Sequence, residues 1–93
     1  MKNATTLRTS IHSDEQIWLR RRFVQKRNEL GLSQKALAEE MGVIASFIGK
    51  IETGDRRLDI FEFISYCHGL GICPSQLFAE LIQRINKATK GKR

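Results

Sequence analysis

The sequence predicts an all-α protein with one domain of five short helices. Apolar residues recur at three- to four-residue spacing in successive segments, and capping residues and glycines separate these segments. No alternating run of apolar and polar residues indicates a strand. The chain has 93 residues, a length that suits a single domain. No apolar run approaches the roughly 20 residues that a membrane span needs, so we expect no membrane association.

The two ends of the chain differ from the segment between them. Residues 1–12 are polar and without periodicity, so we expect a flexible N-terminal arm before a domain at residues 13–86. Residues 87–93 are basic and are expected to form a frayed C-terminal tail. A signal peptide has an apolar stretch and a cleavage site, and the first 12 residues have neither. We therefore expect a cytoplasmic protein.

The five expected helices have recognisable starts and stops. Ser13 followed by Gln16 resembles a capping box, Ser33 and Asp59 are typical N-caps, and Ser75 follows a proline that can begin a helix. Glycines at the ends of the segments act as stops. The helices are expected at residues 14–30, 33–41, 45–53, 59–70 and 75–86.

Apolar spacing also predicts which side chains face the core. In the fourth helix the expected inward residues are Ile60, Phe63, Ile64 and Cys67. The fifth helix has more apolar surface than one small domain needs. Its apolar residues are Leu77, Phe78, Leu81, Ile82 and Ile85. Of these, Leu81, Ile82 and Ile85 are expected either to extend the core or to form a dimer interface, and we favour the interface.

The segment from Gln34 to Thr53 meets the steric demands of a helix-turn-helix. Two helices that cross closely need a small residue at the contact, which Ala38 supplies, and a turn residue that tolerates positive φ, which Gly42 supplies. The inner faces must be apolar. The residues that supply this are Leu37, Met41, Val43, Ile48 and Ile51.

Three segments resemble the phage-repressor or Xre-type helix-turn-helix family. They read RNELGLSQKALAEEMGV, SFIGKIETGDRRLDIFEFISYCHGLGI and SQLF, and lie between Arg20 and Leu81. The resemblance implies a five-helix repressor-like fold whose third helix, here about residues 45–53, enters the major groove, often as part of a two-fold dimer. Most members are transcriptional regulators, and some are antitoxins.

The resemblance also assigns roles to individual positions. Arg27 and Glu52 match a pair that forms an ion pair between the first helix and the end of the third. Gln34 matches a position that grips a DNA phosphate. Lys50, Arg56 and Arg57 lie at the end of the third helix and in the loop after it, so they are candidates for phosphate contacts, the alternative being ordinary surface charges.

Base reading is expected from the outward face of the third helix, at Ala45, Ser46, Gly49 and Lys50. Family members often carry Ser or Thr at the position of Ile44 and Gln at that of Ala45, so a cap and a usual adenine reader are missing here. Gly49 either permits close approach to DNA or is a tolerated defect. We therefore expect modest direct readout, with more weight on phosphate contacts and DNA shape.

The charge and the reactive residues narrow the function classes. The net charge of +6 favours polyanionic partners, and the basic excess lies in the first helix and at the two ends. Cys67 and Cys73 are expected to be free thiols rather than metal ligands, because a zinc site needs four ligands at recognisable spacing. No set of residues indicates catalysis, a cofactor or a metal, so we do not expect an enzyme.

The leading hypothesis is a sequence-specific regulator that binds double-stranded DNA as a homodimer on a pseudo-palindromic operator. An antitoxin-type module that masks a small partner toxin and autoregulates is the alternative. A domain that keeps the fold and has lost DNA reading is the third possibility, because of Ile44 and Ala45.

Overall fold

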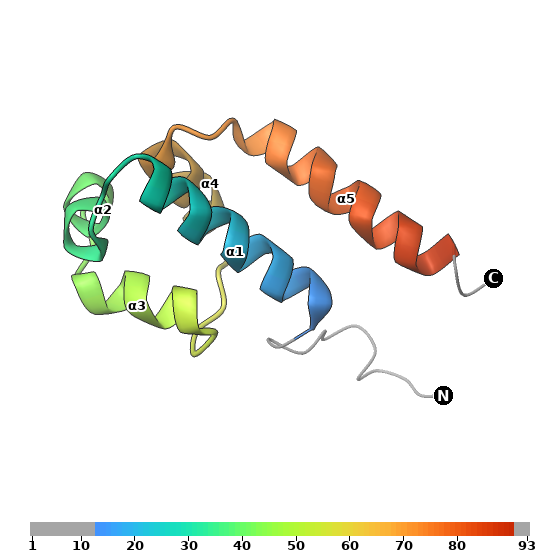
Figure 1. Ribbon diagram of the computed structural model, residues 1–93, viewed down its shortest axis with the longest axis horizontal. Coiled ribbons are helices and arrows are strands. Elements are labelled where there is room, and N and C mark those ends of the chain that lie inside the picture. Colours follow the sequence, from blue (N-terminus) through green and yellow to red (C-terminus); the bar gives the residue numbers. More distant parts are fainter. Residues whose placement is uncertain (1–12, 91–93) are drawn as a thin grey trace.

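The computed structural model describes residues 13–90 and confirms the all-α, five-helix architecture (Figure 1). Within these residues there is no strand. The expected arm at residues 1–12 and the last three residues of the expected tail lie outside the described residues. The helices are α1 (Asp14–Glu29), α2 (Gln34–Met41), α3 (Ala45–Thr53), α4 (Ile60–Leu70) and α5 (Pro74–Lys90).

The helix starts follow from local hydrogen bonds. The Ser33 hydroxyl accepts a bond from the backbone N–H of Ala36 at 3.0 Å and so begins α2. Asp59 and Glu62 form a reciprocal capping box at the start of α4. Pro74 is the first residue of α5, where its fixed φ and missing N–H are tolerated. The helix then continues to Lys90, beyond the boundary at residue 86 that the sequence indicated.

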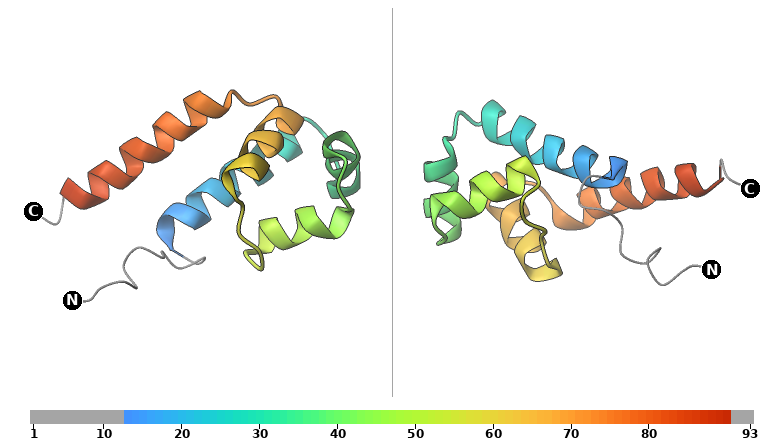
Figure 2. Two further views of the ribbon diagram at one scale, coloured as in Figure 1. Left: turned by 180° about the vertical axis from the view of Figure 1, so that it is seen from behind. Right: turned by 90° about the horizontal axis from the view of Figure 1, so that it is seen from below.

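Helix α1 lies between α5 on one side and α3 on the other and contacts both (Figure 1). Helices α1 and α5 run antiparallel: Arg22 of α1 forms an ion pair with Glu80, and Arg84 lies over the ring of Trp18, one turn earlier in α1. Two further views show α2 and α3 meeting at the end of the molecule far from the C-terminus (Figure 2). This arrangement leaves the outer face of α3 uncovered by the other helices.

The core is built around aromatic residues of α1 and α4. The rings of Phe23 and Tyr66 stack with centroids 4.4 Å apart, and Phe63 packs against Phe23 at 6.2 Å. The expected inner residues of α2 and α3 are buried or pack against this core. The fully or almost fully buried side chains are Phe23, Leu37, Ala38, Ile48, Ile51, Phe63, Tyr66, Cys67, Leu70 and Leu77.

The expected inner face of α4 was partly wrong. Phe63 and Cys67 are buried, but Ile60 and Ile64 are 55% and 38% exposed, and Tyr66 and Leu70 take their place in the core. The reason is the direction of packing. Helix α4 meets α1 and α2 along the face of residues 63, 66, 67 and 70, so residues 60 and 64 fall on its flank.

Within residues 13–90, none of the helices combines the length and the apolar character that crossing a membrane requires.

Candidate nucleic-acid interface

The turn between α2 and α3 has the geometry that the sequence predicted. Gly42 adopts φ 72° and ψ 31°, the left-handed conformation that glycine reaches without steric cost. The backbone N–H of Val43 then bonds to the carbonyl of Ala38 at 2.9 Å, which closes the turn. Ala38 is only 2% exposed and belongs to α2, which packs against both α3 and α4. Helices α2 and α3 are therefore a rigid pair.

Arg27 of α1 and Glu52 of α3 form the ion pair that the family resemblance implies. Arg27 Nε donates to Glu52 Oε2 at 2.6 Å and Arg27 Nη2 donates to Oε1 at 3.0 Å. The two side chains are only 13% and 8% exposed. The hydrogen bond to Glu52 raises the pKa of Arg27 above its ordinary value. Arg27 Nη1 also bonds to the carbonyl of Leu32 at 2.8 Å, so one guanidinium links α1, the α1–α2 loop and α3.

Gln34, the expected phosphate contact, belongs to the same network. Its Nε2 donates to Glu52 Oε1 at 2.9 Å. One amide hydrogen of Gln34 is therefore committed within the protein, and the second remains for an outside acceptor. The sequence did not indicate this bond, because 18 residues separate the two partners.

Gly49 lies where α3 passes Gln34. A Cβ atom at Gly49 would come 3.4 Å from Gln34 Oε1, which is ordinary contact distance. Close packing of α2 on α3 therefore does not require glycine at this position.

The outward face of α3 is short and weakly polar. Ala45, Ser46 and Lys50 are exposed, and Gly49 is partly exposed beside them. The helix begins at Ile44 without a side-chain cap. The structure thus brings together on one face the four residues expected to meet DNA bases.

Arg56 is held in place after the end of α3. Its Nη1 and Nη2 donate to the two carboxylate oxygens of Glu62, each at 2.9 Å, and its guanidinium lies 4.6 Å from the centroid of the Phe47 ring. The bond to Glu62 raises the pKa of Arg56, and the bond to Arg56 lowers the pKa of Glu62. Arg56 therefore ties α3 to the first turn of α4, while its neighbour Arg57 is exposed.

Arg20 is a residue that the sequence reasoning missed. Its guanidinium lies 3.0 Å from where a Cβ atom of Gly54 would be, and Gly54 ends α3 with φ 85°. Arg20 precedes Arg27 by seven residues, two helical turns, so that spacing could have indicated a shared face toward α3.

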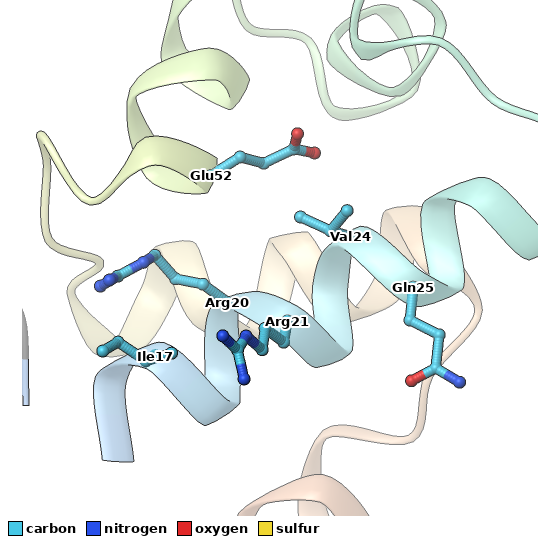
Figure 3. Close-up of a pocket in the computed structure, with 6 residues that line it drawn as sticks. All are labelled: Ile17, Arg20, Arg21, Val24, Gln25 and Glu52. Atoms are coloured by element: carbon cyan, nitrogen blue, oxygen red, sulfur yellow. The ribbon is translucent and has the colours of Figure 1, made fainter. Parts of the chain in front are cut away.

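An open hollow of about 340 Å³ lies between α1 and the end of α3 (Figure 3). Arg20 points along it toward the α3–α4 loop, whereas Arg21 points away. Its lining residues are Ile17, Arg20, Arg21, Val24, Gln25 and Glu52. Among the residues the structure describes, no group of three or more His, Cys, Asp or Glu side chains could hold a metal ion.

A rigid helix pair with an uncovered second helix, braced by a buried ion pair, defines a helix-turn-helix protein of the DNA-binding class. Residues 24–78 match the family model described as helix-turn-helix. A solved structure titled "XRE-family like protein from Pseudomonas syringae pv. tomato str. DC3000" is similar to this chain. It has 35% sequence identity and a TM-score of 0.75, and the match covers 89% of this chain and 98% of that one. A comparison with curated proteins gave no match. The chain belongs to the Xre-type helix-turn-helix family, a family of DNA-binding regulators.

Proposed function

We propose that the protein is a cytoplasmic, sequence-specific transcriptional regulator that lays α3 in the major groove of its operator. The observation that carries the proposal is the pairing of an uncovered face on α3 with the buried Arg27–Glu52 pair behind it. This pair holds α3 at a fixed angle to α1 and α2, so the face reaches DNA without a further ordering cost. Base contacts come from Ala45, Ser46, Gly49 and Lys50.

Phosphate contacts surround this face. Gln34 offers its second amide hydrogen at the start of α2, and Lys50 and Arg57 offer exposed cations at the end of α3 and after it. Arg56 already shares its charge with Glu62, so it contributes to a phosphate contact only through its remaining N–H groups. We therefore assign the larger phosphate contributions to Lys50 and Arg57.

The protein acts as a homodimer through α5. Phe78, Ile82 and Ile85 are 45%, 42% and 42% exposed and form one stripe at i, i+4 and i+7, while Leu81 is half-buried beside them. Ser75, Ala79 and Asn86 flank the stripe on its solvent side and carry no charge. A second copy therefore packs on it without burying a charged group. A two-fold dimer of this kind places its half-sites about 34–36 Å apart.

DNA selection followed by binding over a salt series tests the regulator proposal. Lys50→Ala and Arg57→Ala should each reduce the salt dependence of binding by about one unit of log–log slope. Lys87→Ala on α5 is the matched control, because α1 separates α5 from α3 (Figure 1), and it should leave the slope unchanged. Equal affinity for selected and random DNA at every salt concentration would refute sequence-specific binding.

Sedimentation of Ile82→Glu tests the dimer. The substitution adds a charge to the centre of the stripe without touching the core, so the expected species is a folded monomer with weaker operator binding. Gln83→Glu is the control, since residue 83 is exposed on the same helix and lies outside the stripe. Unchanged sedimentation of Ile82→Glu would exclude this interface.

An antitoxin-type role is the second candidate, and one observation favours a protein partner. Phe61, at the start of α4, is 77% exposed, and the exposed side chains of Ile60 and Ile64 lie on the same helix. Exposed apolar patches of this kind mark protein interaction sites. Co-expression with the product of a neighbouring gene tests it: a stable 1:1 complex that Phe61→Ser disrupts would support the role, and failure to co-purify would remove it.

A further inference from the structure

The start of α3 lacks the capping side chain that the other capped helices have. Ser13, Ser33 and Asp59 each accept a backbone hydrogen bond at the starts of α1, α2 and α4. Ile44 holds the N-cap position of α3 and accepts none with its side chain. Ser, Thr, Asp and Asn are strongly preferred at this position. Helix stability therefore does not account for isoleucine here.

Packing does not account for Ile44 either. Its side chain is 72% exposed, and it is not among the residues that pack against the core. In contrast, Val43 just before it packs against the core, and Ile48 in the first turn after it is buried. An isoleucine that neither caps its helix nor fills the core presents its apolar surface outward.

The position of Ile44 puts that surface at the leading end of the recognition helix. The backbone is extended there, with φ −81° and ψ 153°, and the side chain precedes the first turn of α3. Ala45 and Ser46 are exposed next to it. In helix-turn-helix docking, the N-terminal residues of the second helix meet the base edges. Thymine is the base that presents a methyl group in the major groove.

We propose that Ile44, together with Ala45, reads a thymine methyl group and so determines part of the operator sequence. This inference rests on the proposed function and adds to it the base that one contact selects. A phosphate is excluded as the partner of the Ile44 side chain, because isoleucine offers it no donor. Ser46, one residue further on, offers a hydroxyl to a neighbouring base acceptor.

Replacing thymine by deoxyuridine tests the proposal, because the change removes the methyl group alone. DNA sites are first selected with the unchanged protein, and each thymine of a half-site is then replaced singly. Replacement at one position should lower the affinity of the protein by about three- to fivefold, the value expected when the burial of one methyl group is lost. The variant Ile44→Ser should discriminate thymine from deoxyuridine clearly less at that position, because only Ala45 then remains beside the methyl group. Its thermal stability should be retained or raised, because serine restores the cap.

The variant Ile60→Ser is the matched control. Ile60 is also an exposed isoleucine at the start of a helix, but it belongs to α4, so thymine preference should remain unchanged. The proposal is overturned if no thymine position is sensitive to loss of its methyl group, or if Ile44→Ser weakens binding to both DNAs equally and leaves the preference intact. In both cases selective binding remains and the proposed function stands. Failure to select any DNA overturns the proposed function and this inference together.

Discussion

Replacing Glu52 by Gln removes one charge from the buried pair and changes the shape of the side chain little. Arg27 then keeps its bond to the Leu32 carbonyl and loses its counter-charge. We expect Glu52→Gln to lower the free energy of unfolding substantially and to weaken DNA binding through the looser placement of α3.

Two unit charges about 4 Å apart interact by ~4 kcal/mol at an effective dielectric constant of about 20. Removing one member of a buried pair typically costs ~3–5 kcal/mol, because the other charge stays desolvated. Since Arg27 retains the Leu32 carbonyl, we expect the lower end of this range, about 3 kcal/mol. The total free energy of unfolding of a domain of this size is only ~5–15 kcal/mol. The corresponding fall in Tm is roughly 12–24 °C.

Urea unfolding followed by circular dichroism measures this change. The double variant Arg27→Met with Glu52→Leu completes the test: replacing both charges by apolar groups should recover most of the loss. Glu62→Gln is the control, because its pair with Arg56 is more exposed, and it should cost clearly less stability than Glu52→Gln. If Glu52→Gln costs less than about 1 kcal/mol, the pair does not brace the fold and the argument from burial is wrong.

Three further predictions concern the core and the thiols. Tyr66→Phe should leave stability unchanged or raise it by up to ~1 kcal/mol in urea unfolding, because the buried hydroxyl has no hydrogen-bond partner among the described residues. Gly69→Ala should lower stability by a net ~1 kcal/mol, because the new Cβ would lie 2.9 Å from Met41 Cγ, and that strain exceeds the gain in helix propensity. In the folded protein, iodoacetamide should modify Cys73 first and at lower pH. The Ser75 hydrogen bond lowers the pKa of Cys73, whereas burial raises that of Cys67 to about 11.

Each of these has a result that would contradict it. A loss of more than ~1 kcal/mol in Tyr66→Phe would mean that the hydroxyl is hydrogen-bonded in solution. Gly49→Ala is the control for Gly69→Ala, because its Cβ would have ordinary contacts, and it should gain stability. Equal losses of stability in Gly69→Ala and Gly49→Ala would show that packing against Met41 does not cause the loss in Gly69→Ala. Modification of both thiols with one pH profile, measured by mass spectrometry, would refute the proposed difference in their environments.

The starts of the helices and the ends of α1 to α4 could be predicted from the sequence because their causes are local, whereas α5 continues to Lys90, past the predicted end at residue 86. The Ser33 cap spans three residues, and so does the Asp59–Glu62 capping box. Gly42 has the positive φ that its place after α2 required. The limits of α3 at residues 45–53 were also confirmed: Gly54 ends the helix with a positive φ, although its start has no side-chain cap. These features follow from the residue types and their short spacing along the chain.

Contacts between distant residues were harder to anticipate. The hydrogen bond from Gln34 to Glu52 spans 18 residues, and nothing in the local pattern around either residue indicates it. The Arg56–Glu62 pair spans six residues, but it forms only because the loop folds Arg56 back onto Phe47. Candidate phosphate contacts could therefore be proposed from the sequence by residue type. The sequence could not show which of these side chains are already bonded within the protein.

The sequence by itself determined that the protein is all-α, where its helices begin and where α1 to α4 end, and that α2 and α3 form a helix-turn-helix. Only the tertiary structure decided which flank of α4 stays exposed, that Gln34 shares Glu52 with Arg27, and that the side chain of Ile44 is exposed instead of packing against the core. The physical reason is one of range. Capping and glycine turns act over a few residues of chain, whereas burial depends on how neighbouring helices rotate against one another.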